Sequence, residues 1–149
     1  MTAADRLELS ASLEDYLETI YTLIQEKKVA RVRDIARARG VKAGSVSPAM
    51  RRLADLGLLK YEQREYIDLT EEGERQAFRV VTRHRLLTRF LVDVLRMGPD
   101  AAESDACAME HNMSDEAMTR LTGLVEFLLE HPDVSGELLH RFHDHLEGG

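Results

Sequence analysis

The sequence contains no tryptophan, three prolines and one cysteine, and only 5% of its 149 residues are aromatic. A single cysteine excludes an internal disulfide, so the fold must be stabilised by packing, mostly of aliphatic side chains and methionine. No apolar run approaches the roughly 20 residues that a membrane span needs. The first 25 residues also lack the basic-then-apolar pattern of a secretory signal. We therefore expect a soluble cytoplasmic protein.

Charge is distributed unevenly along the chain. The net charge of −7 argues against a nucleic-acid partner, yet residues 27–64 carry eleven Lys or Arg against three acidic residues. Such an excess of positive charge within one short segment is typical of a surface that contacts phosphates. The length allows one compact domain or two small ones, which excludes a multidomain enzyme.

The first half of the chain predicts three helices. Apolar residues at three- and four-residue spacing predict a helix over 12–27 with Ser12 as its N-cap. Two shorter helices are predicted over 32–39 and 45–56, with Gly40 ending the first of them. Two short helices joined by a brief glycine-containing link are typical of a helix-turn-helix.

The pattern then changes to alternating, β-prone residues. Strands are predicted over 58–62 and 65–70, separated by the polar pair at 63–64. A helix-turn-helix followed at once by a hairpin is a winged helix, and here it falls on the basic segment. Further helices are predicted over 70–95, capped by Thr70, and over 100–112, 114–130 and 135–146, with a turn at 131–133.

We therefore predict a mainly α protein with two domains. Residues 1–74 would form a winged-helix DNA-binding domain with a small β-hairpin. Residues 75–149 would form an all-helical domain, in which the apolar positions of 121–129 suit a dimer contact.

Three potential metal ligands are spaced to share one face of a predicted helix. Cys107, Glu110 and His111 stand at positions i, i+3 and i+4, so a thiolate, a carboxylate and an imidazole project from the same side. All three groups are metal ligands.

Other candidate ligands are less specific. Asp15 and Glu18 share a face of the first helix, where a carboxylate pair is usually solvated, and His84 lies among apolar neighbours, where a histidine usually serves packing. We interpret the three C-terminal histidines as part of a solvated amphipathic tail: His140, His143 and His145.

Three segments of the sequence resemble the DtxR/MntR family of metal-dependent transcriptional repressors. They are SLEDYLETIY at 12–21, RHRLL at 83–87 and CAMEHNMS at 107–114, in the family's order and spacing. The resemblance implies a winged helix joined to a helical metal-binding and dimerisation domain, without the SH3-like third domain of longer members. It also implies a homodimer that binds a divalent cation and then a palindromic operator upstream of metal-uptake genes, which makes the chain a repressor and not an enzyme.

Carried over residue by residue, the resemblance implies a hybrid metal site. Asp15 and Glu18 match the manganese branch of the family, whereas Cys107 matches the iron branch. Thr88 and Glu103 stand where the iron branch has ancillary ligands, so that second site is not expected in its usual form. The implied ligands are Asp15, Glu18, His84, Cys107, Glu110 and His111.

The ligand chemistry gives a partial prediction of the metal. A thiolate favours Fe(II), Co(II), Ni(II) or Zn(II), while three carboxylates favour harder ions such as Mn(II). We favour Fe(II) as the co-repressor, with Mn(II) as the alternative, and expect Co(II), Ni(II) or Zn(II) to bind in vitro. In this hypothesis, metal at the domain junction fixes the dimer for operator binding.

The predicted recognition helix supplies the candidate DNA contacts. Side chains at or near its start should approach the bases, and nearby arginines should contact phosphates. Two other classes stay open, a winged-helix regulator without a metal effector and a small metalloenzyme, although nothing in the sequence indicates a substrate pocket. The candidate DNA-contacting residues are Arg31, Arg33, Lys42, Ser45, Ser47, Arg51 and Arg64.

Overall fold

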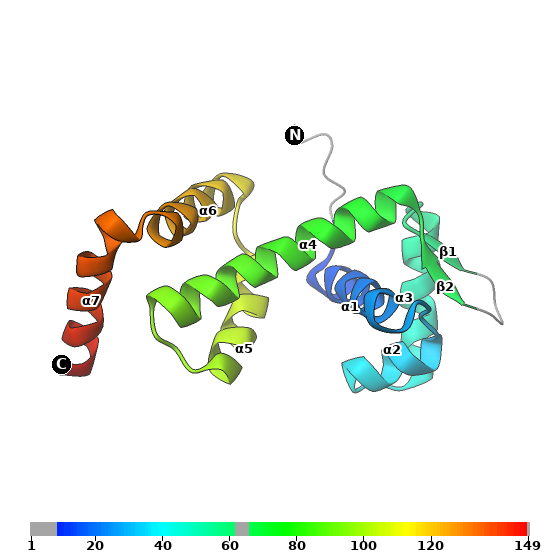
Figure 1. The fold of residues 1–149 in the computed structure, drawn as a ribbon. Coiled ribbons are helices and arrows are strands. Elements are labelled where there is room, and N and C mark those ends of the chain that lie inside the picture. The colour runs from blue at the N-terminus through cyan, green and yellow to red at the C-terminus, as the bar shows by residue number, and fades with distance from the viewer. Residues whose placement is uncertain (1–8, 62–65, 149) are drawn as a thin grey trace. The chain divides into compact units, whose positions relative to one another are not determined.

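The computed structural model describes residues 9–61 and 66–148. The chain divides into two compact units, Met1–Val81 and Thr82–Gly149, and the division falls inside the long helix α4, Glu71–Arg89 (Figure 1). The predicted fold class is confirmed, because the described chain is mainly helical with one two-stranded antiparallel sheet. No helix among the described residues is long and apolar enough to cross a membrane.

The first unit is a winged helix. Its elements are α1 (Ala11–Lys27), α2 (Val32–Arg39), α3 (Ala43–Asp55), β1 (Leu59–Tyr61), β2 (Ile67–Leu69) and the first part of α4. The strands pair with Leu59 opposite Leu69 and Tyr61 opposite Ile67, and Ile67 N also donates to the Ala30 oxygen at 2.8 Å. The core is formed by aliphatic side chains from the helices and the sheet: Leu17, Ile20, Ile35, Val46, Met50, Leu53, Leu58 and Ile67.

Two helix starts differ from the prediction. The N-cap of α1 is Ser10, not Ser12, because the Ser10 hydroxyl accepts a hydrogen bond from Leu13 N at 3.2 Å. Helix α3 begins at Ala43, two residues before the predicted start, with Lys42 as its N-cap. The end of α2 agrees with the prediction, since Gly40 takes the left-handed conformation (φ 65°) that favours glycine.

Thr70 joins the sheet to α4. Its hydroxyl accepts from Gly73 N at 3.0 Å, which is the predicted cap, and donates to the Gly57 oxygen at 2.6 Å. Gly73 lies so close to the backbone just before β1 that a Cβ there would stand 1.9 Å from the Leu58 carbonyl oxygen. Only glycine fits this approach. The predicted turn at 63–64 lies outside the described residues.

The second unit contains the rest of α4, a π-helical turn η2 (Phe90–Val94), α5 (Pro99–Glu110), α6 (Asp115–Glu130) and α7 (Pro132–Gly148). A single α-helix over 70–95 is therefore wrong, because α4 gives way to the wider turn at Phe90. The break between the last two helices falls where the turn at 131–133 was expected, but it consists of His131 alone, so the last helix begins at 132 and not at 135. Pro132 begins α7, where a missing backbone N–H costs nothing.

The N-cap Ser114 agrees with the prediction, since its hydroxyl accepts from Ala117 N at 3.1 Å. In the apolar segment 121–129, Val125 and Leu128 are buried within the chain, whereas Leu124 is exposed. The small core nearest α5 consists of Leu87, Leu91, Ala102, Ala106 and Met118.

Candidate metal centre

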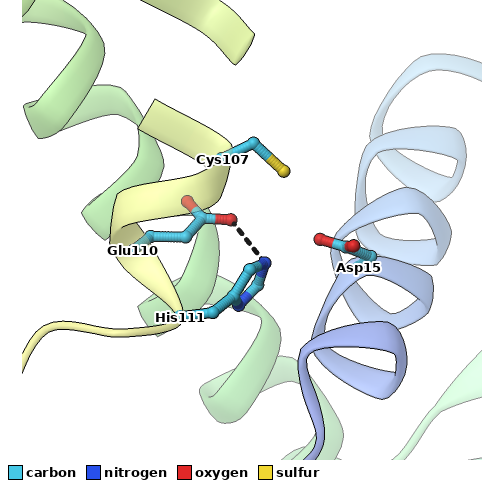
Figure 2. Close-up of side chains that lie close together, drawn as sticks. All are labelled: Asp15, Cys107, Glu110 and His111. Atoms are coloured by element: carbon cyan, nitrogen blue, oxygen red, sulfur yellow. Dashed lines mark ion pairs between the residues drawn. The ribbon is translucent and has the colours of Figure 1, made fainter. Parts of the chain in front are cut away.

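Helix α5 brings three of the predicted ligands together. Cys107, Glu110 and His111 lie at its C-terminal end, and each offers a ligand atom within 4.8 Å of the others (Figure 2). Nε2 of His111 lies 3.2 Å from Oε1 of Glu110, the ion pair drawn as a dashed line in Figure 2. The one-face arrangement follows from helical spacing alone, as the sequence predicted.

His84 joins this cluster from the α4 segment of the same unit. Its Nδ1 lies 2.9 Å from Oε2 of Glu110, and its Nε2 lies 2.6 Å from Oε1 of Glu103. His84 and Glu110 are buried, at 8% and 1% exposure. His84 is therefore more than a packing residue, because both of its ring nitrogens face carboxylates.

The donor set fits a divalent transition metal. A thiolate, a carboxylate and two imidazoles suit ions such as Fe(II) and Zn(II). The buried Oε1 of Glu110 faces Nε2 of His111 at 3.2 Å, yet among the described residues it accepts no well-aligned hydrogen bond. A buried carboxylate oxygen without a well-aligned donor is costly, and a bound cation would offset that cost.

Asp15 and Glu18 lie on α1 of the first unit, three residues apart and both partly buried. Oδ2 of Asp15 accepts from Nη2 of Arg39 on α2 at 3.3 Å. Asp15 is also labelled in Figure 2. The part that Asp15 and Glu18 play in a shared site stays a prediction.

Two residues outside the predicted ligand set make notable contacts. Glu103, which the resemblance placed only at an ancillary position, pairs with His84. Arg39 pairs with Asp15 across 24 positions, a separation from which no sequence spacing could have indicated contact.

The predicted recognition helix α3 has one apolar face and one exposed face. Val46, Met50 and Leu53 are fully buried against the first unit's core. Four of the proposed DNA-contacting side chains lie on this helix or at its N-cap: Lys42, Ser45, Ser47 and Arg51. Ser47 is half-buried, and the other three are exposed.

The three remaining DNA candidates differ in their surroundings. Arg33 is exposed on α2. Arg31 is half-buried, and its Nη2 donates to the Tyr66 hydroxyl at 3.0 Å while its guanidinium lies 4.8 Å from the centre of that ring. Arg64 lies outside the described residues.

Comparison with known families accounts for both units. Residues 8–66 match the N-terminal DNA-binding domain of iron-dependent repressors, and residues 70–138 match the metal-binding and dimerisation domain of the same family. The descriptions of the two matched domains name DNA binding in the first unit and metal binding and dimerisation in the second.

Individual relatives agree with this. The chain is 37% identical to the transcriptional regulator MntR of Lysinibacillus sphaericus over 85% of its own length and 91% of that protein. It is 34% identical to a helix-turn-helix regulator of Methanocaldococcus jannaschii, over 79% of its own length and 95% of that protein.

Among solved structures, a manganese-dependent repressor in complex with manganese matches with a TM-score of 0.70 and 35% identity over 77% of this chain. IdeR of T. acidophilum matches with a TM-score of 0.65 and 29% identity over 78% of this chain. The chain spans about half the length of these two structures, 53% in each. Both family domains and these relatives show that the chain belongs to the DtxR/MntR family of metal-dependent transcriptional repressors, which are regulators and not enzymes.

Proposed function

We propose that this chain is an Fe(II)-responsive repressor of metal homeostasis. The observation that carries the proposal is the cluster on α5, where a cysteine stands beside a buried glutamate and a histidine within 4.8 Å. The thiolate of Cys107 adds a soft donor, which favours Fe(II) over Mn(II). The six proposed ligands are Asp15, Glu18, His84, Cys107, Glu110 and His111.

The proposed ligands come from two units, which gives the site a regulatory role. Asp15 and Glu18 would hold the ion from the winged helix, while the other four would hold it from the helical unit. Without a cation, carboxylates brought to one place repel one another and favour a mobile arrangement of the units. When bound, a divalent cation supplies the positive charge that offsets this repulsion and fixes the spacing of the two winged helices in a dimer.

For DNA recognition, α3 would enter the major groove. Its exposed face would present Lys42, Ser45, Ser47 and Arg51, while Arg31, Arg33 and Arg64 would contact phosphates. Two winged helices related by a dimer axis suit a palindromic operator, because the symmetry of the protein then matches that of the site.

Manganese is the second candidate, and a specific observation favours it. Asp15 and Glu18 add two hard oxygen donors, which suit Mn(II). Relatives named as MntR, and a solved repressor described with manganese, also support this alternative. Co(II), Ni(II) and Zn(II) should bind in vitro, because a site with nitrogen and sulfur ligands has a higher affinity for these ions than for Fe(II) or Mn(II).

The metal preference is tested by changing the thiolate alone. Anaerobic titration of the metal-free protein gives the ratio of its affinities for Fe(II) and Mn(II). We expect Cys107→Asp to lower the Fe(II)-to-Mn(II) affinity ratio, since a hard oxygen replaces the sulfur. Ala108→Asp is the matched control, because it adds the same charge at an exposed neighbouring position of α5. An unchanged ratio in Cys107→Asp would remove the basis for preferring iron.

A further inference from the structure

Asp15 already has a cationic partner within its own unit. Nη2 of Arg39 lies 3.3 Å from Oδ2 of Asp15, and the Arg39 guanidinium lies 5.9 Å from the centre of the Tyr16 ring. We propose that Arg39 is an internal counter-ion that a divalent metal must displace from Asp15, so that this arginine lowers the metal affinity of the repressor. The inference rests on the proposed role of Asp15 as a metal ligand.

The two partners differ in their freedom to move. The Asp15 side chain is only 16% exposed and is followed in α1 by the buried residues Tyr16 and Leu17, so its carboxylate is held in place and poorly hydrated. The Arg39 side chain is 36% exposed and belongs to the last residue of α2. A cation arriving at Asp15 would therefore move the arginine, while the carboxylate stays.

Arg39 is also suited to leaving. It lies in the last turn of α2, where the negative end of the helix dipole stabilises a cation whether or not Asp15 is its partner. When the guanidinium moves away from Asp15 into water, it keeps this interaction with the helix, so only part of its electrostatic stabilisation is lost. Metal and guanidinium would otherwise compete for the same carboxylate and repel each other as like charges.

The position of Arg39 connects the metal site with the DNA-binding elements. Arg39 is the last residue before the Gly40–Lys42 link that leads into α3. Displacing it would change a contact between α1 and the helix-turn-helix inside the first unit. The metal would then affect the DNA-binding unit directly, in addition to any effect on the spacing of the two units.

The test compares Arg39→Gln with Arg37→Gln by titrating the metal-free homodimer with Mn(II) in competition with a fluorescent chelator. Arg37 is an exposed arginine of the same helix, and its replacement makes the same change in net charge. We expect Arg39→Gln to bind Mn(II) about two- to fivefold more tightly, the range that partly exposed ion pairs give. Arg37→Gln should match the unchanged protein.

The outcomes separate the inference from the proposed function. The same comparison is made anaerobically with Fe(II). If the unchanged protein binds neither Mn(II) nor Fe(II), the proposed metal site fails, and the inference fails with it. If the unchanged protein binds normally and Arg39→Gln binds equally or more weakly, only the role of Arg39 is overturned. An equal gain in Arg37→Gln would also overturn it, because the effect would then come from overall charge.

A metal-free measurement provides an independent readout. Thermal unfolding of Arg39→Gln, Asp15→Asn and the double variant gives the coupling between the two side chains. We expect Arg39→Gln to lower the melting temperature of the metal-free protein, and to lower it less in the Asp15→Asn background. Strictly additive effects would contradict the ion pair and with it the inference.

Discussion

Glu110 Oε2 lies 2.9 Å from Nδ1 of His84, and this contact joins α5 to α4. The Glu110 carboxylate is almost completely buried. The other oxygen of Glu110 lies 3.2 Å from Nε2 of His111. Glu110 thus stands between two imidazoles, and each of the three side chains offers a metal-binding atom. We regard it as the central residue of the ligand cluster in the helical unit.

Replacing this carboxylate should separate metal response from folding. Glu110→Gln keeps the size of the side chain but removes the charge that a cation needs. We expect metal-stimulated DNA binding to be lost and metal affinity to fall by about tenfold or more. Losses of this size are seen even when the residue removed only hydrogen-bonds to a metal ligand. DNA-binding titrations with and without metal measure the loss.

Size-exclusion chromatography and circular dichroism supply the control for Glu110→Gln. The variant should remain a folded dimer, because glutamine can still hydrogen-bond to His84. A normal metal response in this folded variant would contradict the assigned site.

The DNA surface is tested through two arginines in different settings. Arg51 is exposed on α3, whereas Arg31 is held by Tyr66. We expect Arg51→Ala to weaken operator binding. Arg31→Ala should weaken binding to all sequences alike and reduce the slope of log affinity against log salt by about one, as loss of a phosphate contact does.

Tyr66→Phe is the matched control for Arg31, since it keeps the ring beneath the guanidinium and removes the hydroxyl acceptor. We expect a smaller loss of affinity with an unchanged salt slope. If operator affinity at moderate salt is unaltered in both Arg31→Ala and Arg51→Ala, the DNA surface has been assigned to the wrong face.

Gly73 provides a test of the packing between α4 and the backbone of Leu58, just before β1. In Gly73→Ala the added Cβ would meet a backbone oxygen of Leu58, which has little freedom to move. We expect the free energy of unfolding to fall by about 2 kcal/mol or more, toward the upper part of the usual range for overpacking. Chemical denaturation measures this change.

Gly44→Ala is the corresponding control within the same unit. Nothing lies within 4 Å of a Cβ at Gly44, so alanine should leave stability equal or slightly higher. Equal stability of the two variants would show that the close approach at Gly73 is wrong.

Local features of this fold were predictable because they depend on neighbouring residues. The end of α2 follows from Gly40, and the grouping of Cys107, Glu110 and His111 follows from helical spacing. The start of α1 was misplaced because two nearby serines could both act as caps, and the hydrogen bond to Leu13 N selects Ser10.

Features that depend on tertiary packing were not predictable in the same way. The π-helical turn at Phe90–Val94 has no spacing signature in the sequence. The contact of His84 with Glu103 needs α4 and α5 to pack together. The Arg39–Asp15 pair likewise depends on how α1 meets α2. The resemblance implied His84 as a candidate ligand, but its contacts with Glu110 and Glu103 come from the packing of the helices.

The central claim is that a divalent metal controls DNA binding, and the most direct test is operator affinity of the unchanged protein with metal and with chelator. The measurement is made anaerobically at fixed salt and matched free Fe(II) or Mn(II). We predict that saturating metal tightens DNA binding about 5- to 150-fold, the usual range of coupling between two sites. If the operator affinity with chelator equals the operator affinity with Fe(II) and also that with Mn(II), the account is contradicted. That result would favour a winged-helix regulator that does not respond to metal.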